Sequence, residues 1–468
     1  MGTRSAHSHT WITSVPLAWW LFAAYAVLSV VFAHERILNT DCSYQLFHSV
    51  NDRNFFFQEA RYGVFVTQIP MLLGVLVSAP MEALVHLYSA GFVLVYGGAV
   101  FLALRVFKSP SAALAIMLSL LASTASTFFH STTETHLLLA LGCLLHASMP
   151  WYAAERTWAR RSVVALILLW SLWTHPNALF TVTFVLGIAY LRKHVTTIEA
   201  AAAAGLCAAY FAVRLLTMPD GGYDQRQYDE LIRSGEQLQR FWALYPNWWL
   251  TERSTNEYVA AIIMVLAVLL FNRKPLELLF TSACATVMYV VTVLTFHEGS
   301  GDAMMEKSFM PITFMFSLLF AELCYRPGRR TAWRVLAVCG CVHAFVNTVA
   351  YSRHYTQRLD VLGQLIRENG TTAAKMVLLW KDADRSGLRF SEWATSLDAL
   401  MLSRCIGEHP CTVFMADSLS ADAPALNDPD AFLYLPWDPY GSELKNTTYF
   451  GLPRTPYRIL RVGLTPVR

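Results

Sequence analysis

Charged residues are scarce in this sequence: Asp, Glu, Lys and Arg make up 15% of its 468 residues, against about 25% in an average soluble protein. The 55% of residues that are hydrophobic cluster in runs with almost no charge, so the composition excludes an ordinary cytosolic protein and favours a membrane. An excess of one charge sign is also missing, because 36 Lys and Arg face 33 Asp and Glu. This balance argues against a nucleic-acid-binding protein, which needs a concentrated basic face.

Cysteine and glycine patterns exclude further classes. The nine cysteines have neither the density of a disulfide scaffold nor the paired spacing of a zinc site. A phosphate-binding loop of the G-x-x-x-x-G-K-[ST] kind is absent from the sequence, which argues against an ATP-driven machine. The first apolar stretch is too long for a signal peptide and lacks a small-residue cleavage site. We therefore expect it to be retained as the first membrane helix.

Eleven apolar runs are candidates for membrane-spanning helices, which need about 20 residues each. They cover residues 16–33, 84–104, 110–129, 137–153, 162–174, 177–191, 196–217, 257–271, 276–296, 308–324 and 332–351. A further run, 64–79, is shorter. If it does not span, every short basic loop falls on the cytoplasmic side, as the positive-inside rule requires. We therefore predict a juxtamembrane or re-entrant helix at 64–79.

The predicted fold is an all-α polytopic membrane protein with a small C-terminal α/β or α+β domain. The transmembrane module covers residues 1–351, with its N-terminus inside and with larger outside segments at 34–83 and 218–256. A soluble extracytoplasmic domain covers 352–468 and begins with a helical pattern that stops at Gly370, a helix-ending signal. Cys405 and Cys411 lie close in this domain, either as a local disulfide or as two free thiols.

Asp41 is the first candidate for chemistry, because it follows the first span on the outside face. The amphipathic pattern of Tyr44, Leu46, Phe47 and Val50 predicts a helix along the membrane interface. A carboxylate held at the membrane surface suits a reaction on a lipid-anchored substrate. The alternative is that Asp41 only caps the helix that it opens.

Glu134 is a second candidate at the outside end of two predicted spans. A carboxylate at that depth is costly unless it is paired or hydrated, so it indicates a functional site. His130 and His136 flank it and offer metal ligands. Their spacing, however, does not place all three on one helical face, so we predict no metal here. The histidines are also explained as hydrogen-bonded loop anchors.

Three further candidates, His297, Glu298 and Lys307, share a later outside loop. Lys307 comes just before a predicted helix with a positive N-terminal end, where anions are attracted. The alternative for Lys307 is that it only extends to the membrane surface. His175 occupies another outside end, where it either donates to a phosphate or caps the turn that the following proline imposes.

These segments together resemble the GT-C superfamily of multispanning glycosyltransferases, which take a sugar from a polyprenyl-phosphate carrier. The resemblance covers roughly residues 10–351 and rests on TDCSYQLF with Asp41, the following VFVTQIPMLLG, STTETHLLLALG with Glu134, THPNALF with His175, and KSFMP from Lys307. Two departures matter. Asp41 is followed by Cys-Ser instead of another acid, which weakens any acidic-pair metal site. Lys307-Ser stands where the family has Arg-Tyr. The positive charge is kept, but the bidentate hydrogen bonding of a guanidinium is lost.

The resemblance implies a hexosyl- or pentosyltransferase that uses a polyprenyl-phosphate sugar and a lipid, glycan or protein acceptor. Asp41 would be the general base and Glu134 would position the acceptor or tune Asp41. No cofactor is expected; a divalent metal stays open as an alternative, although no acidic pair supports it. An apolar groove beside 64–79 would hold the polyprenyl chain. The residues assigned to substrate and phosphate binding are Lys307, His175, Arg61, His297 and Glu298, with Arg53 as an alternative to Arg61.

Other classes stay open at this point. A transporter or flippase of lipid-linked or small solutes would need polar groups near the bilayer midplane. A non-catalytic membrane anchor would use its outside tail to recruit partners, and a ligase or polymerase of lipid-linked glycans is the nearest competing enzyme. Because no organelle address stands out, we expect a bacterial inner membrane with an extracytoplasmic site, with the endoplasmic reticulum as the alternative. The expected partners are the lipid-linked donor and membrane lipid, not nucleic acid.

Overall fold

The computed structural model describes residues 16–122, 124–132, 134–217, 222, 225–226, 229, 266, 269–270, 274–295, 302–326, 330–386, 388, 393–407, 409–416, 423–434 and 444–460. Most of the predicted outside segment 218–256, and most of the predicted span 257–271, lie outside these residues.

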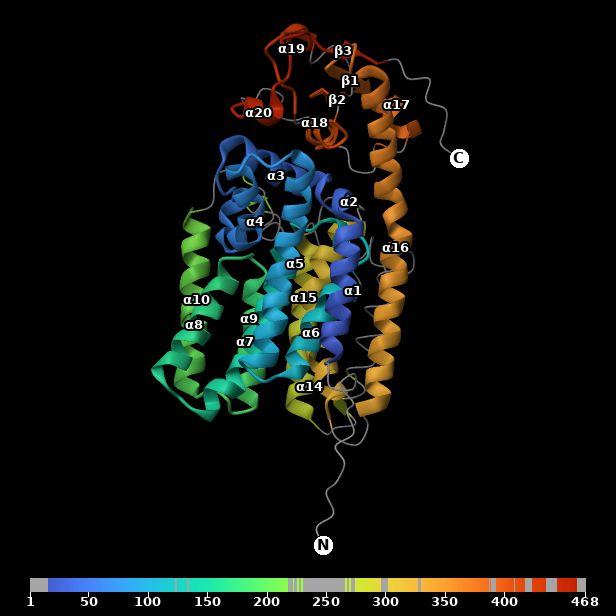
Figure 1. The fold of residues 1–468 in the computed structure, drawn as a ribbon. Helices are drawn as coiled ribbons and strands as arrows, with labels where there is room; N and C mark the ends of the chain where they lie inside the picture. The colour runs from blue at the N-terminus through green and yellow to red at the C-terminus, as the bar shows by residue number, and fades with distance from the viewer. Residues whose placement is uncertain are drawn as a thin grey trace.

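A bundle of roughly parallel helices forms the larger part of the described chain (Figure 1). This membrane bundle contains α1 (Leu17–Val31), α5 (Met81–Arg105), α6 (Pro110–Leu121), α7 (Glu134–Ala154), α8 (Trp158–Leu172), α9 (Ala178–Leu191), α10 (Thr197–Thr217), α14 (Pro275–Thr295), α15 (Asp302–Cys324) and α16 (Arg330–Asn369). Helices α6 and α7 are almost entirely buried, as expected for helices that are apolar on all sides.

Four of the described helices are long and apolar enough to cross a membrane: α5, α7, α10 and Thr331–Asn369 of α16. Shorter apolar segments of 10–17 described residues occur in five other helices of the bundle: Leu17–Val31, Pro110–Leu121, Ala178–Leu191, Pro275–Val291 and Phe309–Cys324. The prediction of a mostly helical membrane protein is therefore confirmed, whereas the number of eleven spans stays a prediction. One predicted span, 110–129, is shorter in the structure, because α6 ends at Leu121 and a separate 3₁₀ turn, η4, covers Thr127–Phe129.

The loops predicted to lie inside meet at one end of the membrane bundle. Arg192, Lys274 and Tyr325 come from three such connections and, with Ser111 from the start of α6, line one cavity of about 350 Å³. The Arg192 guanidinium joins α14 and α15 there, because it donates to Glu277 at 2.9 Å and also pairs with Glu322. The end of the bundle away from this cavity, where α2 (Ala33–Ile37) and α3 (Thr40–Asp52) lie, is called the outer end below (Figure 1).

The predicted juxtamembrane helix at 64–79 is α4 (Phe65–Leu76), whose 12 residues are too few to span a membrane. It packs closely on α5 at the outer end. A Cβ atom added to Gly91 of α5 would lie 2.0 Å from the carbonyl oxygen of Thr67, so only glycine permits this approach. The opposite side of α4 exposes an apolar stripe of Phe65, Ile69, Leu73 and Leu76.

Helix α16 carries the chain out of the membrane bundle (Figure 1). Its 40 residues span about 60 Å at about 1.5 Å per residue, twice the hydrocarbon thickness of about 30 Å. The predicted domain boundary at residue 351 falls inside this helix, so the last predicted span and the helical pattern after it form one element. The helix ends at Asn369, where the amide of Gly370 donates to the Ile366 carbonyl at 2.7 Å.

A small α/β unit follows α16 and is called the C-terminal unit. Its strands β1 (Lys375–Leu379), β2 (Thr412–Ala416) and β3 (Arg458–Ile459) form a parallel sheet in the order β2-β1-β3. Between β1 and β2 the chain forms α17 (Trp380–Ser386) and α18 (Thr395–Cys405). The expected α/β character is therefore observed. No disulfide joins Cys405 and Cys411.

The C-terminal unit covers the apolar face of α3, which corrects the expectation that this face lies along the membrane interface. Phe47 packs against Phe432 and Phe450, with ring centroids 5.8 and 5.0 Å apart. At the end of α3, the Asn446 side chain donates to the Val50 carbonyl at 2.8 Å. An amphipathic pattern shows only that one face is covered, and here the cover is protein instead of lipid.

A buried ion pair holds α16, α18 and the α2–α3 connection together. The Arg358 guanidinium on α16 donates to Asp398 on α18 at 2.5 Å, to the Thr395 hydroxyl at 3.2 Å and to the Leu38 carbonyl at 3.5 Å. Both charged side chains are at most 1% exposed.

Replacing only one partner of this pair would leave a buried charge without its counterion. We expect Arg358→Met to lower the free energy of unfolding of the C-terminal unit by about 3–5 kcal/mol. The double variant Arg358→Met/Asp398→Leu should recover most of the loss, because it buries no charge. Thermal unfolding in detergent measures both, and a double variant as unstable as the single one would contradict this account.

Candidate active site

Asp41 lies in the first turn of α3 at the outer end. The cap position belongs to Asn39, whose side chain makes no cap hydrogen bond, so the alternative role of Asp41 as the helix cap is not observed. The residue between them, Thr40, has a φ of 40°, a left-handed conformation that is rare for a β-branched residue. Such strained residues cluster at functional sites. The Asp41 side chain stays 31% exposed and is therefore accessible.

Lys307 meets Asp41 from a distant part of the sequence. Its ammonium lies 3.8 Å from the Asp41 carboxylate, beyond hydrogen-bonding distance, so both groups keep capacity for a substrate. The structure corrects one detail of the prediction. Helix α15 begins at Asp302, so Lys307 lies inside the helix and not before it.

The neighbour of Lys307, Glu306, fixes α15 to the loop that precedes α7. Its carboxylate accepts hydrogen bonds from the amide of Ser126 at 2.9 Å and from the amide and hydroxyl of Thr127 at 2.8 and 3.0 Å. Glu306 is only 4% exposed, and such charge-assisted bonds are strong when buried. Glu306 therefore sets where the next residue, Lys307, can reach.

The same loop, residues 124–132, is fixed to the segment that carries Asp41. The fully buried Arg36 donates to the Phe128 carbonyl at 3.2 Å and lies over the Phe128 ring at 4.7 Å. His130 shares a hydrogen bond of 3.2 Å with the Thr40 hydroxyl and another of 3.0 Å with the Tyr355 hydroxyl. The strained residue before Asp41 is thus held by a histidine that α16 in turn supports.

Arg61 and Glu134 form a buried ion pair. The Arg61 guanidinium donates to the Glu134 carboxylate at 3.0 Å, and the two side chains are 6% and 3% exposed. Glu134 belongs to the first turn of α7, where the helix dipole also favours its negative charge. Glu134 is therefore placed to hold Arg61, and the more exposed Asp41 is better placed to meet a substrate.

Gly63 sets the position of Arg61 by a close contact with the turn before α9. Its amide donates to the Trp173 carbonyl at 2.9 Å, and its carbonyl accepts from the Trp170 ring at 2.8 Å. A Cβ atom at Gly63 would lie 2.9 Å from the Thr174 Cα, so only glycine fits. This contact brings the Arg61 segment beside His175.

His175 lies among the positive charges of this site. Its Nδ1 atom accepts the amide of Asn177 at 3.1 Å, which is the turn-capping role that the sequence left open. Burial lowers the pKa of His175 well below its usual value, and the nearby charges of Arg61, Lys307 and Arg214 lower it further. His175 is therefore neutral, and three cationic side chains lie within electrostatic reach of it.

The sequence did not single out Arg214, although a charge inside the apolar run 196–217 was a signal for it. Arg214 is 7% exposed and donates to the Glu59 carbonyl at 3.0 Å. Tyr355 and Arg36 gave no sequence signal, since their roles depend on long-range contacts. His297 and Glu298 lie outside the described residues, so their predicted roles stay predictions. Arg53 ends α3 in a left-handed conformation, beside the C-terminal unit.

Two other chemistries have little support at this site. Burial raises the pKa of the Cys42 thiol to about 11, so Cys42 is protonated and is a poor nucleophile. The alternative metal site at His130, Glu134 and His136 is not formed by the described side chains, because Glu134 pairs with Arg61 and His130 bonds to Thr40 and Tyr355.

No protein-family model matches the chain, and a search of curated proteins gives no significant match. The function is therefore inferred from the residues and their positions.

His130 should make the stability of the outer end depend on pH. Burial lowers the pKa of His130 to about 4, with Asp41 opposing this shift and Lys307 adding to it. An unfolded histidine titrates near pH 6.5, so the unfolded chain takes up the proton first as the pH falls. The stability contributed by neutral His130 is complete above about pH 6.5 and is lost toward about pH 4.

We expect His130→Asn to reduce the fall in melting temperature between these two pH values, measured in detergent. His409→Asn, which changes an exposed histidine of the C-terminal unit, is the control and should behave as wild type. Equal acid sensitivity in all three proteins would contradict the assignment.

Proposed function

We propose that this chain is a membrane glycosyltransferase that moves a sugar from a polyprenyl-phosphate donor to an acceptor hydroxyl at the outer end of its bundle. The observation that carries the proposal is the open Asp41–Lys307 pair, in which an accessible carboxylate and an ammonium lie 3.8 Å apart. A base for the acceptor and a cation for the leaving phosphate are the two groups that this reaction needs.

In the proposed reaction, Asp41 takes the proton of the acceptor hydroxyl as its oxygen attacks the anomeric carbon. The bond between that carbon and the phosphate oxygen breaks, and its electron pair leaves with the lipid phosphate. Lys307 would stabilise the negative charge on that phosphate, helped by Arg61 and Arg214 near His175. Neutral His175 adds no charge of its own, so the phosphate contact that the resemblance implies would be a hydrogen bond donated by its Nε2–H.

The surface of α4 supports a lipid-linked donor. Its exposed apolar stripe begins with Phe65, four residues after Arg61, and continues along the helix to Leu76. A polyprenyl chain on this stripe would leave its phosphate near the cations of the site. The same arrangement suits a ligase or polymerase of lipid-linked glycans. These enzymes differ from the proposed glycosyltransferase in the acceptor that they use. An extracytoplasmic site in a bacterial inner membrane remains our preferred location.

Asp41→Asn tests the assigned base. A general base contributes about 10²- to 10⁴-fold, so we expect sugar transfer to fall by that factor. The measurement is release of polyprenyl phosphate from a panel of polyprenyl-phosphate hexoses and pentoses by the purified chain in liposomes. Asp52→Asn, at the other end of α3, is the matched control and should keep wild-type turnover. Turnover by Asp41→Asn close to the wild-type rate would reject the base.

Lys307 tests the phosphate contact separately from the base. A hydrogen bond to a charged group is worth about 1.5–3 kcal/mol, which corresponds to about 10- to 150-fold in affinity. We expect Lys307→Met to weaken binding of polyprenyl phosphate by that factor, while Lys307→Arg keeps most of it because the charge remains. If both variants bind polyprenyl phosphate as tightly as wild type, Lys307 does not contact the phosphate.

A further inference from the structure

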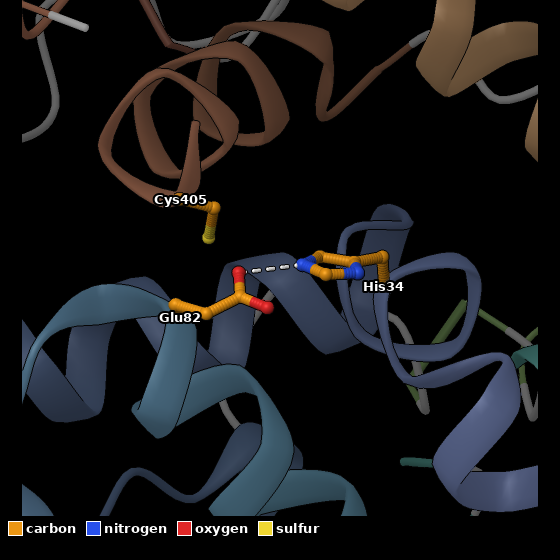
Figure 2. Close-up of side chains that lie close together, drawn as sticks. All are labelled: His34, Glu82 and Cys405. Carbon is orange, nitrogen blue, oxygen red and sulfur yellow. Dashed lines mark hydrogen bonds and ion pairs between the residues drawn. The ribbon is translucent and has the colours of Figure 1, made fainter. Parts of the chain in front are cut away.

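A second group of chemically reactive side chains joins the C-terminal unit to the outer end of the membrane bundle (Figure 2). His34 comes from α2, Glu82 from the first turn of α5, and Cys405 from the last turn of α18. One histidine nitrogen, one carboxylate oxygen and the cysteine sulfur all lie within 4.8 Å of one another. In Figure 2 the thiol points from α18 toward the Glu82 carboxylate, beside the His34 ring.

A fourth side chain, His86, lies next to this group on the next turn of α5. Glu82 uses both carboxylate oxygens, one 2.7 Å from Nε2 of His34 and the other 3.2 Å from Nε2 of His86. The ring centroids of the two histidines are 5.6 Å apart. Glu82 and His86 are one helical turn apart, so both side chains leave α5 on the same face.

We propose that His34, Glu82, His86 and Cys405 bind a transition-metal ion of the zinc type, which fastens the C-terminal unit to α2 and α5. Thiolate, imidazole and carboxylate are the ligands that zinc takes in proteins, usually four in number. Calcium and magnesium prefer oxygen ligands alone, so this mixed group selects against them. The site does not depend on the proposed glycosyltransferase activity.

Among His34, Glu82 and Cys405, the distances require only small side-chain movements. Zinc bonds of about 2.0–2.3 Å place tetrahedral ligand atoms about 3.3–3.7 Å apart. The 2.7 Å contact between His34 and Glu82 would lengthen, and the sulfur would move inward from its present limit of 4.8 Å. The side chains of His34, Glu82 and His86 are 34–43% exposed, so an ion can reach them from solvent. Binding would replace the thiol proton of Cys405, which passes to water.

An ion pair of Glu82 with the two histidines is the competing explanation, and Cys405 distinguishes the two. In a simple ion pair the Cys405 thiol, which comes from the C-terminal unit, would only donate a hydrogen bond to Glu82. A metal site, in contrast, loses a ligand when that sulfur is removed. Metal binding would hold α2 in place, and α2 leads within a few residues to Asn39 and the strained Thr40. It would therefore help to fix the segment that carries Asp41.

The test uses the purified full chain in detergent, stripped with a chelator and titrated with ZnCl₂. We expect one zinc ion per chain, an increase in melting temperature, and a thiolate absorption band when Co²⁺ replaces zinc. Cys405→Ser should weaken zinc binding at least about tenfold and remove the Co²⁺ band. Cys339→Ser, which changes an exposed cysteine of α16, is the matched control and should bind as wild type. Excess Ca²⁺ should not displace zinc.

Two results would overturn the proposal: no zinc bound by the wild-type chain, or wild-type zinc affinity in Cys405→Ser. If Cys405→Ser unfolds, His86→Gln provides the second test, since it leaves α18 unchanged. That variant should also weaken zinc binding at least about tenfold. Unchanged affinity in this variant would remove His86 from the site and reject the four-ligand arrangement.

Discussion

The structure of the outer end depends on the hydrogen bonds that the Glu306 carboxylate accepts. It accepts two backbone amides and one hydroxyl from Ser126 and Thr127, in a buried position where such bonds are strong. The 124–132 loop is also the part of the chain that contacts Arg36 and Thr40. Because Lys307 follows Glu306 directly, this anchor helps to position Lys307 relative to Asp41, although the two residues are far apart in the sequence.

Much of the helical organisation follows from the sequence, since apolar runs and basic loops have direct physical causes. The positions at which helices end at the outer end of the bundle are harder to predict from the sequence. The run 110–129 looks like one span, yet α6 ends at Leu121 and the aromatic residues after it pack inside protein. Phe128 and Phe129 are nearly fully buried beside Arg36 and Tyr355. Hydropathy measures removal from water and cannot separate burial in lipid from burial in protein.

The candidate site was predictable as a set of residues but not as a set of pairs. Asp41, Glu134 and Lys307 stand out because a charge at the end of an apolar run is costly without a purpose. Which charge meets which depends on tertiary contacts such as the fit of Gly63 against Thr174, and no local pattern contains them. The resemblance implies that Glu134 positions the acceptor or tunes Asp41, and only the structure reveals Arg61 as the partner of its carboxylate.

The C-terminal unit belongs to the architecture of the site and is not merely attached to it. Arg358, just before this unit, reaches both Asp398 of α18 and the Leu38 carbonyl. Tyr355, one turn earlier, supports His130, which in turn bonds to Thr40. A left-handed, non-glycine backbone costs of order 1–3 kcal/mol and persists only where its surroundings impose it. The conformation that places Asp41 therefore depends on contacts from both the membrane bundle and the helix that leads to the C-terminal unit.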